Sequence, residues 1–420
     1  MLILDLAAKS LLNRRFTASL AILSIAVSVA LLVGVNRLSE GTRASFQSTI
    51  SGTDLIVGAR GSSTQLLLYS VFHIGDATKD MSFAAYEDVA GLPDVAWAVP
   101  LALGDSHRGF RVVGTSTDYF EHFRHGGKKR LAFADGAPFA DLFDVVIGAD
   151  VARTLGYRPG DKVVVAHGSG TAAIHDHDTL PFTVTGTLAP TGTPVDRALY
   201  VPLDAITAIH VDWQSGRPPR PGEETSADAL RTEELPPPRV TAMLLGLKSR
   251  MGLFQTQRAI NEYEAEPLTA ILPGVVITEI WRLIGVAERA LTVISGFVVA
   301  AGLFGMIGIL LTALNERRRE IAILRSLGAT PAAVLGLFTL ESLLFGAAGI
   351  VLGYGVLSLA SLLLADFVST RFGLFLPFHW LTATDLKLFA AVLGASGLLG
   401  LVPAGIAYRS ALTDGLAMRL

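Results

Sequence analysis

Cysteine is absent from the 420 residues of this chain. Disulfides and cysteine-ligated metals are therefore excluded, although the absence does not fix a cellular compartment. Charged residues are also scarce: they make up 17% of the chain, whereas soluble proteins carry about 25%. The net charge is only −3, so the sequence has no basic excess that would predict binding to nucleic acid.

Apolar residues make up 51% of the chain, and the mean hydropathy of the chain is +0.50. Four runs contain no charged residue and reach the length of about 20 residues that crosses a bilayer. They cover residues 16–36, 290–315, 342–365 and 388–408. The sequence thus predicts four transmembrane helices. The first run could be mistaken for a signal peptide, but no clear small-x-small cleavage site follows it, so we expect a retained helix.

Basic residues near the ends of these runs predict the orientation of the chain, because cytoplasmic loops are enriched in them. Arginines and lysines cluster before the first run, between the second and third, and after the fourth. The loop between the third and fourth runs has only Arg371 and Lys387. We therefore expect both termini and residues 315–331 in the cytoplasm, and residues 37–289 on the other side of the membrane.

Residues 37–289 predict a mixed α/β domain. Strands are expected at residues 144–147, 162–166, 182–188 and 199–202, and helices at residues 149–155 and 203–210. Gly156 is expected to end the first of these helices. A proline-rich stretch, residues 214–238, predicts a surface insertion. Ile277, Ile280 and Trp281 recur at helical spacing, which predicts that the domain has helical, stalk-like ends.

The chain is thus expected to have three regions. Residues 1–36 hold an amphipathic helix at the membrane interface, with Asp5, Lys9 and Asn13 on one polar stripe, followed by the first span. Residues 37–289 form the extracytoplasmic domain, inserted between transmembrane helices 1 and 2. Residues 290–420 hold the last three spans and the cytoplasmic loop 315–331.

The loop 315–331 carries the most informative motif. Charge flanks a short apolar stretch, Gly328 can end a helix, and Thr330 and Pro331 can start the next one. Such a short amphipathic element predicts a docking site for a partner, which in a transporter is usually an ATPase. The residues expected to couple to it are Glu316, Arg317, Arg318, Arg319, Glu320, Arg325, Leu327 and Gly328.

Glycines recur in the predicted spans, where small residues let helices approach closely. The candidates for helix packing are Gly302, Gly305, Gly308, Gly349 and Gly353. They would serve either contact between two copies or ordinary packing within one. No predicted span has a charged residue near its centre, so the sequence does not predict an ion pathway.

Histidines are the one clue to a ligand. His175 and His177 alternate with Asp176 and Asp178, so both rings would share one face of an extended segment and could bind zinc. His167, at the other end of the same loop, could complete the site. A solvated polar loop is the alternative. His122 and His125 form a second, looser pair.

Together these features resemble the MacB/LolC/FtsX-type ABC transporter permeases, also called type VII or mechanotransmission transporters. Residues 316–329 are similar to the family's cytoplasmic loop, and residues 146–149, 156–161 and 182–186 to its outer core domain. Glu341 stands where the family often has a glutamate. The resemblance implies a bacterial inner-membrane protein whose membrane helices form no wide channel. It also implies a second permease copy or a paralogue, and an outer domain moved by ATP-driven closure of the nucleotide-binding subunits.

The sequence has no G-x-x-x-x-G-K-[ST] phosphate loop. The resemblance therefore implies that ATP and Mg bind a separate ATPase subunit. Residues 190–199 and 209–214 resemble a branch of the family linked to zinc uptake and to histidine-rich periplasmic proteins. Two alternatives stay open: lipoprotein extraction or tripartite efflux with a periplasmic adaptor, and FtsX-like regulation of a periplasmic hydrolase. A metalloenzyme is not expected, because no activating glutamate or nucleophile accompanies the histidines.

Overall fold

The computed structural model describes residues 15–167, 180–213, 225–232, 235, 237–316, 321, 323, 326, 328–372 and 381–413. The chain divides into two compact units. The helical unit comprises Met1–Gly41, Ile284–Val368 and Leu376–Leu420, and the α/β unit comprises Thr42–Leu283 and Ser369–Phe375. The predicted coupling residues Arg317, Arg318, Arg319, Glu320, Arg325 and Leu327, and the predicted metal ligands His175, His177 and Asp178, lie outside the described residues.

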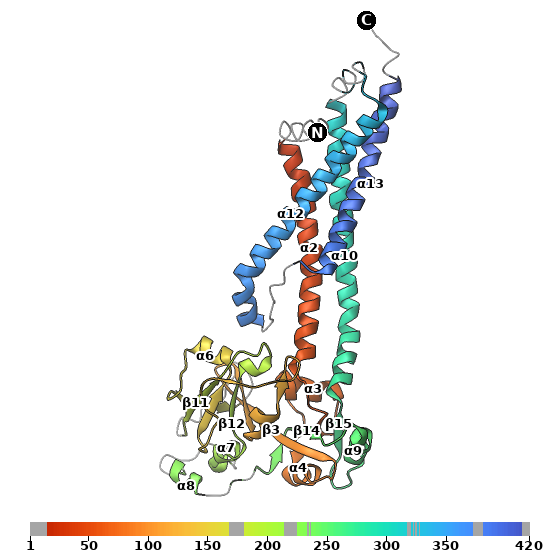
Figure 1. Ribbon diagram of the computed structural model, residues 1–420. Coiled ribbons are helices and arrows are strands. Elements are labelled where there is room, and N and C mark those ends of the chain that lie inside the picture. Colours follow the sequence, from red (N-terminus) through yellow and green to blue (C-terminus); the bar gives the residue numbers. More distant parts are fainter. Residues whose placement is uncertain are drawn as a thin grey trace. The chain divides into compact units, whose positions relative to one another are not determined.

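Four long helices make up the helical unit (Figure 1): α2 (Arg15–Thr49), α10 (Pro273–Glu316), α12 (Pro331–Phe372) and α13 (Ala383–Thr413). Each is long and apolar enough to cross a membrane. Buried side chains from all four form one core, which includes Ile25, Leu303, Phe345 and Val392. Leucine, valine and phenylalanine on the opposite faces are exposed, as expected of helices that meet lipid.

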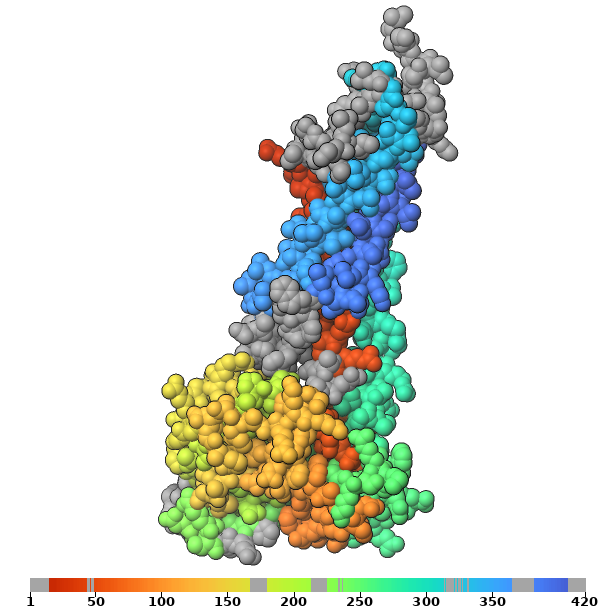
Figure 2. Space-filling model, in the orientation of Figure 1, coloured from red at the N-terminus to blue at the C-terminus, as the bar shows by residue number. Residues whose placement is uncertain are grey.

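The helices extend beyond the uncharged runs from which they were predicted. Helical hydrogen bonding does not require apolar side chains, so α2 continues past Asn36 and α12 begins well before Ser342. Glu341 consequently lies inside α12 and is buried rather than at the start of a span. In Figure 2, α12 and α13 occupy much of the visible face of the helical unit, and their close approach at Gly346, Gly397 and Gly400 places them side by side.

The α/β unit is built on one large sheet. Eleven strands belong to it, with nine in the order β15-β1-β14-β3-β4-β12-β8-β11-β7, while β10 pairs with β3 and β9 with β11. The bounds are β1 Leu55–Ala59, β3 Val95–His107, β4 Phe110–Thr115, β7 Phe133–Gly136, β8 Asp144–Ile147, β9 Lys162–Val163, β10 Ala166–His167, β11 Phe182–Leu188, β12 Ala198–Pro202, β14 Ala242–Leu247 and β15 Leu268–Ile271. Two-stranded pairs form from β2 (Met81–Ser82) with β13 (Arg239–Val240), and from β5 (Arg124–His125) with β6 (Lys129–Arg130).

Short helices cover this sheet. They are α3 (Ser63–Val71), α4 (Phe83–Ala90), α5 (Asp118–His122), α6 (Ala149–Leu155), α7 (Leu203–Ala208), α8 (Ala227–Arg231) and α9 (Leu253–Asn261). Alternation along β1 shows how the core is divided: Ile56 enters one apolar cluster with Leu67 of α3, whereas Leu55 and Val57 enter another with Val89 of α4. The sheet is therefore buried on both faces.

Most of the predicted elements of this unit are confirmed. Residues 144–147 and 182–188 are strands, and the helix 149–155 ends at Gly156, whose φ is +75°. The single strand predicted at 162–166 is wrong, because its two halves pair with different strands, β9 with β11 and β10 with β3. Part of the proline-rich stretch is packed rather than a free insertion, since α8 buries Leu230 in the core.

Candidate functional site

Three of the long helices, α2, α10 and α12, have residues in both units, and α2 and α10 carry the chain into and out of the main part of the α/β unit. The chain leaves the helical unit within α2, at residues 41–42, and re-enters it within α10, at residues 283–284. In the α/β unit, Phe46 of α2 stacks on Phe72 with ring centroids 4.5 Å apart, and meets Trp281 of α10 edge to face at 5.8 Å. Ile277 and Trp281 are buried in the same apolar cluster, as their spacing predicts. The ends of both helices are therefore part of the core of the α/β unit.

An ion pair ties three helices of the helical unit together. Arg37 of α2 lies 2.8 Å from Asp385 of α13, donates a hydrogen bond of 3.0 Å to the hydroxyl of Tyr354 in α12, and lies over that ring at 5.0 Å. The Asp385 side chain is fully buried, and that of Arg37 is 16% exposed. We call Arg37, Tyr354 and Asp385 the clasp. A buried pair of this kind holds its helices in one arrangement, because separating the charges would leave each unpaired in an apolar setting.

Local sequence positions Asp385 for this role. Thr382 precedes α13 and accepts a hydrogen bond of 3.1 Å from the Asp385 backbone, while the Asp385 carboxylate accepts one of 3.1 Å from the Thr382 backbone. This reciprocal pair is a capping box, with aspartate in the place of the usual glutamate. The Asp385 carboxylate thus caps the N-terminus of α13 and also forms the ion pair with Arg37.

The glycines predicted for helix packing fall into two groups. A Cβ at Gly302 would lie 2.7 Å from Ser28 Oγ, one at Gly349 would lie 2.5 Å from Ile25, and one at Gly353 would lie 2.3 Å from the Ala26 carbonyl. These three let α10 and α12 approach α2 within one chain. At Gly305 and Gly308 an added Cβ would meet no described atom within 4 Å.

The coupling segment is described only in part. Ile321 is buried beside Leu314, Val334 and Phe338, at the adjoining ends of α10 and α12. Gly328 has a φ of +95°, the conformation that glycine commonly provides after a helix. Thr330 accepts a backbone hydrogen bond from Ala333, and Pro331 begins α12. Glu316 is the last residue of α10.

Of the predicted metal ligands, only the backbone of His167 is described, where it pairs with Asp105 through β10 and β3. Of the looser pair, His125 is buried in β5, while His122 ends α5. Ligand atoms of Asp118, Glu121 and His122 lie within 4.8 Å of one another. The His122 ring stacks on Trp97 at 4.9 Å, which fixes its plane.

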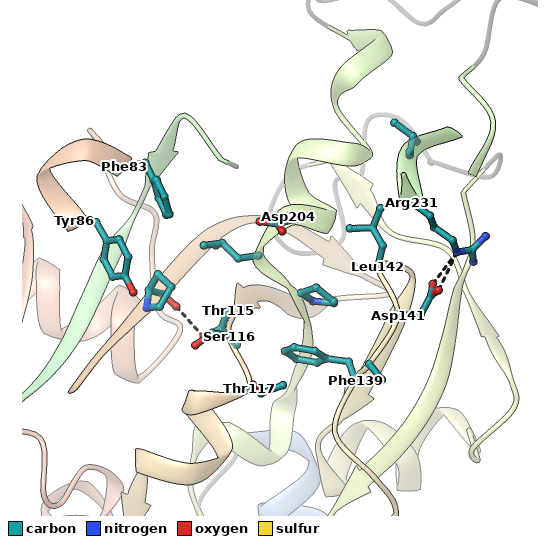
Figure 3. A pocket seen from close by; sticks show the side chains of 15 residues that line it. Phe83, Tyr86, Thr115, Ser116, Thr117, Phe139, Asp141, Leu142, Asp204 and Arg231 are labelled. Atoms are coloured by element: carbon teal, nitrogen blue, oxygen red, sulfur yellow. Dashed lines mark hydrogen bonds and ion pairs between the residues drawn. The ribbon is translucent and has the colours of Figure 1, made fainter. Parts of the chain in front are cut away.

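A cavity of about 540 Å³ opens in the α/β unit. It lies where the parallel strands β4 and β12 end, since Thr115 pairs with Pro202 and the residues that follow both strands line it. Open sheets commonly bind ligands at such strand ends. Figure 3 shows Phe83 and Tyr86 of α4 on one side and Asp141 with Arg231 on the other.

The charges on the Arg231 side of this cavity are paired. Arg231 Nε donates to both carboxylate oxygens of Asp141, at 3.0 and 2.9 Å, and Nη1 donates to Asp228 at 2.9 Å. Burial acts to raise the pKa of Asp141, but its hydrogen bonds from the Phe143 backbone and Arg231 outweigh burial and leave the pKa lowered. Asp204, in the first turn of α7, has a raised pKa because it is partly desolvated.

The sequence did not single out the clasp or the cavity. Arg37 and Asp385 stand just outside the uncharged runs, and no local pattern marks them as partners. Thr382 and Asp385, three residues apart before an apolar run, are the one local signal that could have marked the start of α13. The cavity joins residues from six separate parts of the chain, and no spacing rule predicts it.

Known families match both parts of the chain. The MacB-like periplasmic core domain matches residues 18–249, and the FtsX-like permease C-terminal domain matches residues 292–414. The chain therefore belongs to the MacB/LolC/FtsX family of ABC transporter permeases. It is a membrane protein with a periplasmic-type core domain.

Individual relatives are distant. The lipoprotein-releasing system transmembrane protein LolC of Neisseria meningitidis is 26% identical over 239 residues, which are 54% of this chain and 51% of that protein. The macrolide export ATP-binding/permease protein MacB of Nitrobacter winogradskyi is 25% identical over 414 residues, 94% of this chain and 56% of that protein. The chain spans about half the length of the curated relatives it matches.

Among solved structures, the periplasmic region of MacB from Actinobacillus actinomycetemcomitans aligns with 56% of this chain and 94% of its own, at 10% identity and a TM-score of 0.34.

Proposed function

We propose that this chain is the permease subunit of an ABC transporter, and that a separate ATPase drives motion of its α/β unit through α2 and α10. The observation that carries the proposal is that both helices continue from the helical unit into the core of the α/β unit, where Phe46 meets Trp281. A continuous helix is stiff, and a close-packed core does not deform gradually. A displacement of either helix would therefore move the α/β unit as a body.

The partner ATPase would bind ATP and Mg and would dock on the coupling segment, residues 315–331. Ile321 of this segment is buried among the ends of α10 and α12, which supports transmission of a force from this point to both helices. A second permease copy or a paralogue would complete the assembly, with Gly305 and Gly308 available for close approach because neither is covered by a described atom. The ATP turnover of the purified complex tests the proposal.

We place the chain in a bacterial inner membrane, with the termini and coupling segment in the cytoplasm and the α/β unit in the periplasm. The chain has no cysteine, so a thiol reagent can label only a cysteine that has been introduced. A cysteine in place of Met251, which is 93% exposed, is expected to react with an impermeant thiol reagent in intact spheroplasts. One in place of Ser326 is expected to react only after the membrane is opened. Labelling of Ser326→Cys in sealed spheroplasts would reverse the orientation.

For the cargo, zinc is one candidate, held by His175 and His177 with His167 or Asp178. The described group of Asp118, Glu121 and His122 offers a second set of zinc-type ligands. We expect the full-length protein in lipid nanodiscs to bind zinc in calorimetry, more weakly as the pH falls through about 6.5, where an ordinary histidine gains a proton.

Two double variants separate the possible zinc sites: His175→Ala with His177→Ala, and Asp118→Asn with His122→Ala. Loss of binding in one of them identifies its site. Wild-type affinity in both variants would exclude these two sites, and no binding by the wild type would remove zinc as the cargo.

Export or extraction of an amphiphilic molecule is the second candidate for the cargo. The observation that favours it is the cavity of the α/β unit, whose lining combines aromatic and aliphatic side chains with polar ones. Regulation of a periplasmic hydrolase, as in FtsX, is a third possible role for the motion of the α/β unit. The proposed coupling to the ATPase is the same for all three roles.

A further inference from the structure

The cavity at the ends of β4 and β12 has a mixed lining, in which aromatic and aliphatic side chains stand beside hydroxyl and charged ones. Phe83 and Tyr86 stack with ring centroids 5.2 Å apart. Phe139, Leu142, Leu203 and Leu230 contribute further apolar surface. The volume of about 540 Å³ falls within the range of pockets that bind small organic molecules. The aromatic and aliphatic part of the lining therefore suits the apolar body of a ligand, and the polar part suits a charged or polar group.

One ionised group in this lining has no partner. The lining contains three charged residues, Asp141, Arg231 and Asp204. Asp141 and Arg231 neutralise one another. No described residue forms a hydrogen bond or ion pair with the Asp204 side chain, which Figure 3 shows between the two sides of the cavity. Its place in the first turn of α7 gives it a structural role as well, through the helix dipole. That role leaves its carboxylate oxygens available to a ligand.

The charged side chains around the cavity are mostly acidic. Burial raises the pKa of Tyr86 to about 12, and the carboxylates of Asp118 and Glu87 add to that shift. The single cation of the lining, Arg231, is shared between Asp141 and Asp228. Acidic groups thus outnumber basic ones beside the cavity, and a cation would be attracted to it.

We propose that this cavity binds an organic cation with a bulky apolar body, with Asp204 as its counter-ion and the Phe83–Tyr86 pair as the aromatic wall. Aromatic faces attract cations as well as apolar groups, so both halves of such a ligand find a matching surface. A bare metal ion fits less well, because Asp204 is the only unpaired carboxylate of the lining. The binding site itself does not depend on the proposed function. Only the role of the bound cation as transported cargo rests on it.

Tetraphenylphosphonium is a suitable probe, because tetraphenylborate has nearly the same size and shape and the opposite charge. The full-length protein in lipid nanodiscs is titrated with each ion by calorimetry, and empty nanodiscs are subtracted to remove partition into lipid. The wild type is expected to bind the phosphonium and not the borate. Asp204→Asn is expected to lower the phosphonium affinity at least about fivefold, the loss of roughly one ion pair. Asp204→Glu is expected to keep most of it.

The matched control is Asp135→Asn, which removes an exposed carboxylate of β7 outside the cavity. It is expected to leave phosphonium binding unchanged. Three results would overturn the proposal: no binding by the wild type, equal binding of the two ions, or equal phosphonium affinity in the wild type and Asp204→Asn. Because the titration needs neither ATP nor a partner, its failure would leave the proposed coupling intact, and a failure of coupling would leave this binding intact.

Discussion

Reversing Arg318 and Arg319 to glutamate is expected to abolish the ATP turnover that this chain stimulates in its partner ATPase, while membrane insertion stays normal. The two arginines lie in a segment that starts at the end of α10 and is anchored by buried Ile321. Charge reversal turns attraction for a partner surface into repulsion, which costs several kcal/mol where the charges face each other. Turnover is measured on the co-purified complex in nanodiscs.

Two controls isolate the effect of that reversal. Arg318→Lys with Arg319→Lys keeps the charge and should retain much of the turnover. Arg158→Glu with Arg250→Glu reverses two exposed arginines of the α/β unit and should have no effect on it. Normal co-purification and turnover in the Arg318/Arg319 reversal would show that the coupling segment does not dock the ATPase.

Breaking the clasp is expected to have the second large effect. Asp385→Ala leaves the Arg37 guanidinium without its carboxylate in a mostly buried setting and also removes half of the capping box of α13. Removing one partner of a buried pair typically costs about 3–5 kcal/mol. The variant should therefore unfold at lower denaturant than the wild type, and stimulated ATP turnover should fall, because α2 is no longer held to α12 and α13.

The matched variant is Arg37→Leu with Asp385→Leu, since replacing both charges by apolar groups is often neutral. It should regain most of the stability that Asp385→Ala loses. Tyr354→Phe, which removes only the hydroxyl that accepts from Arg37, should cost about 1 kcal/mol. Wild-type unfolding of Asp385→Ala would mean that the clasp does not hold the helices together.

The sequence predicts the parts of this fold that depend on local patterns. The four helices follow from uncharged runs, and β8, α6 and β11 follow from β-branched stretches, a glycine stop and alternation. The single strand predicted at residues 162–166 is wrong because its two halves pair with two different strands, β11 and β3. Which strands pair depends on contacts between segments that are distant in the sequence, and a short apolar run does not predict these contacts.

The clasp and the cavity were missed for a related reason. The clasp joins three helices that are far apart in the sequence, through Arg37, Tyr354 and Asp385. No local sequence pattern therefore marks these residues as partners. The same is true of Asp204 and Tyr86, which both line the cavity. The histidine-based zinc site stays a prediction, because its principal ligands lie outside the described residues.

The central claim, that ATP moves the α/β unit through α2 and α10, is tested most directly by a distance measurement. Spin labels at Lys79→Cys in the α/β unit and Lys387→Cys in the helical unit report on the two bodies, and both native side chains are exposed. With the partner ATPase present, ATP trapped by vanadate should shift the electron–electron distance distribution relative to ADP, and the Arg318/Arg319 reversal should remove the shift. An identical distribution with ADP and with trapped ATP, in a complex that hydrolyses ATP at the normal rate, would contradict the account.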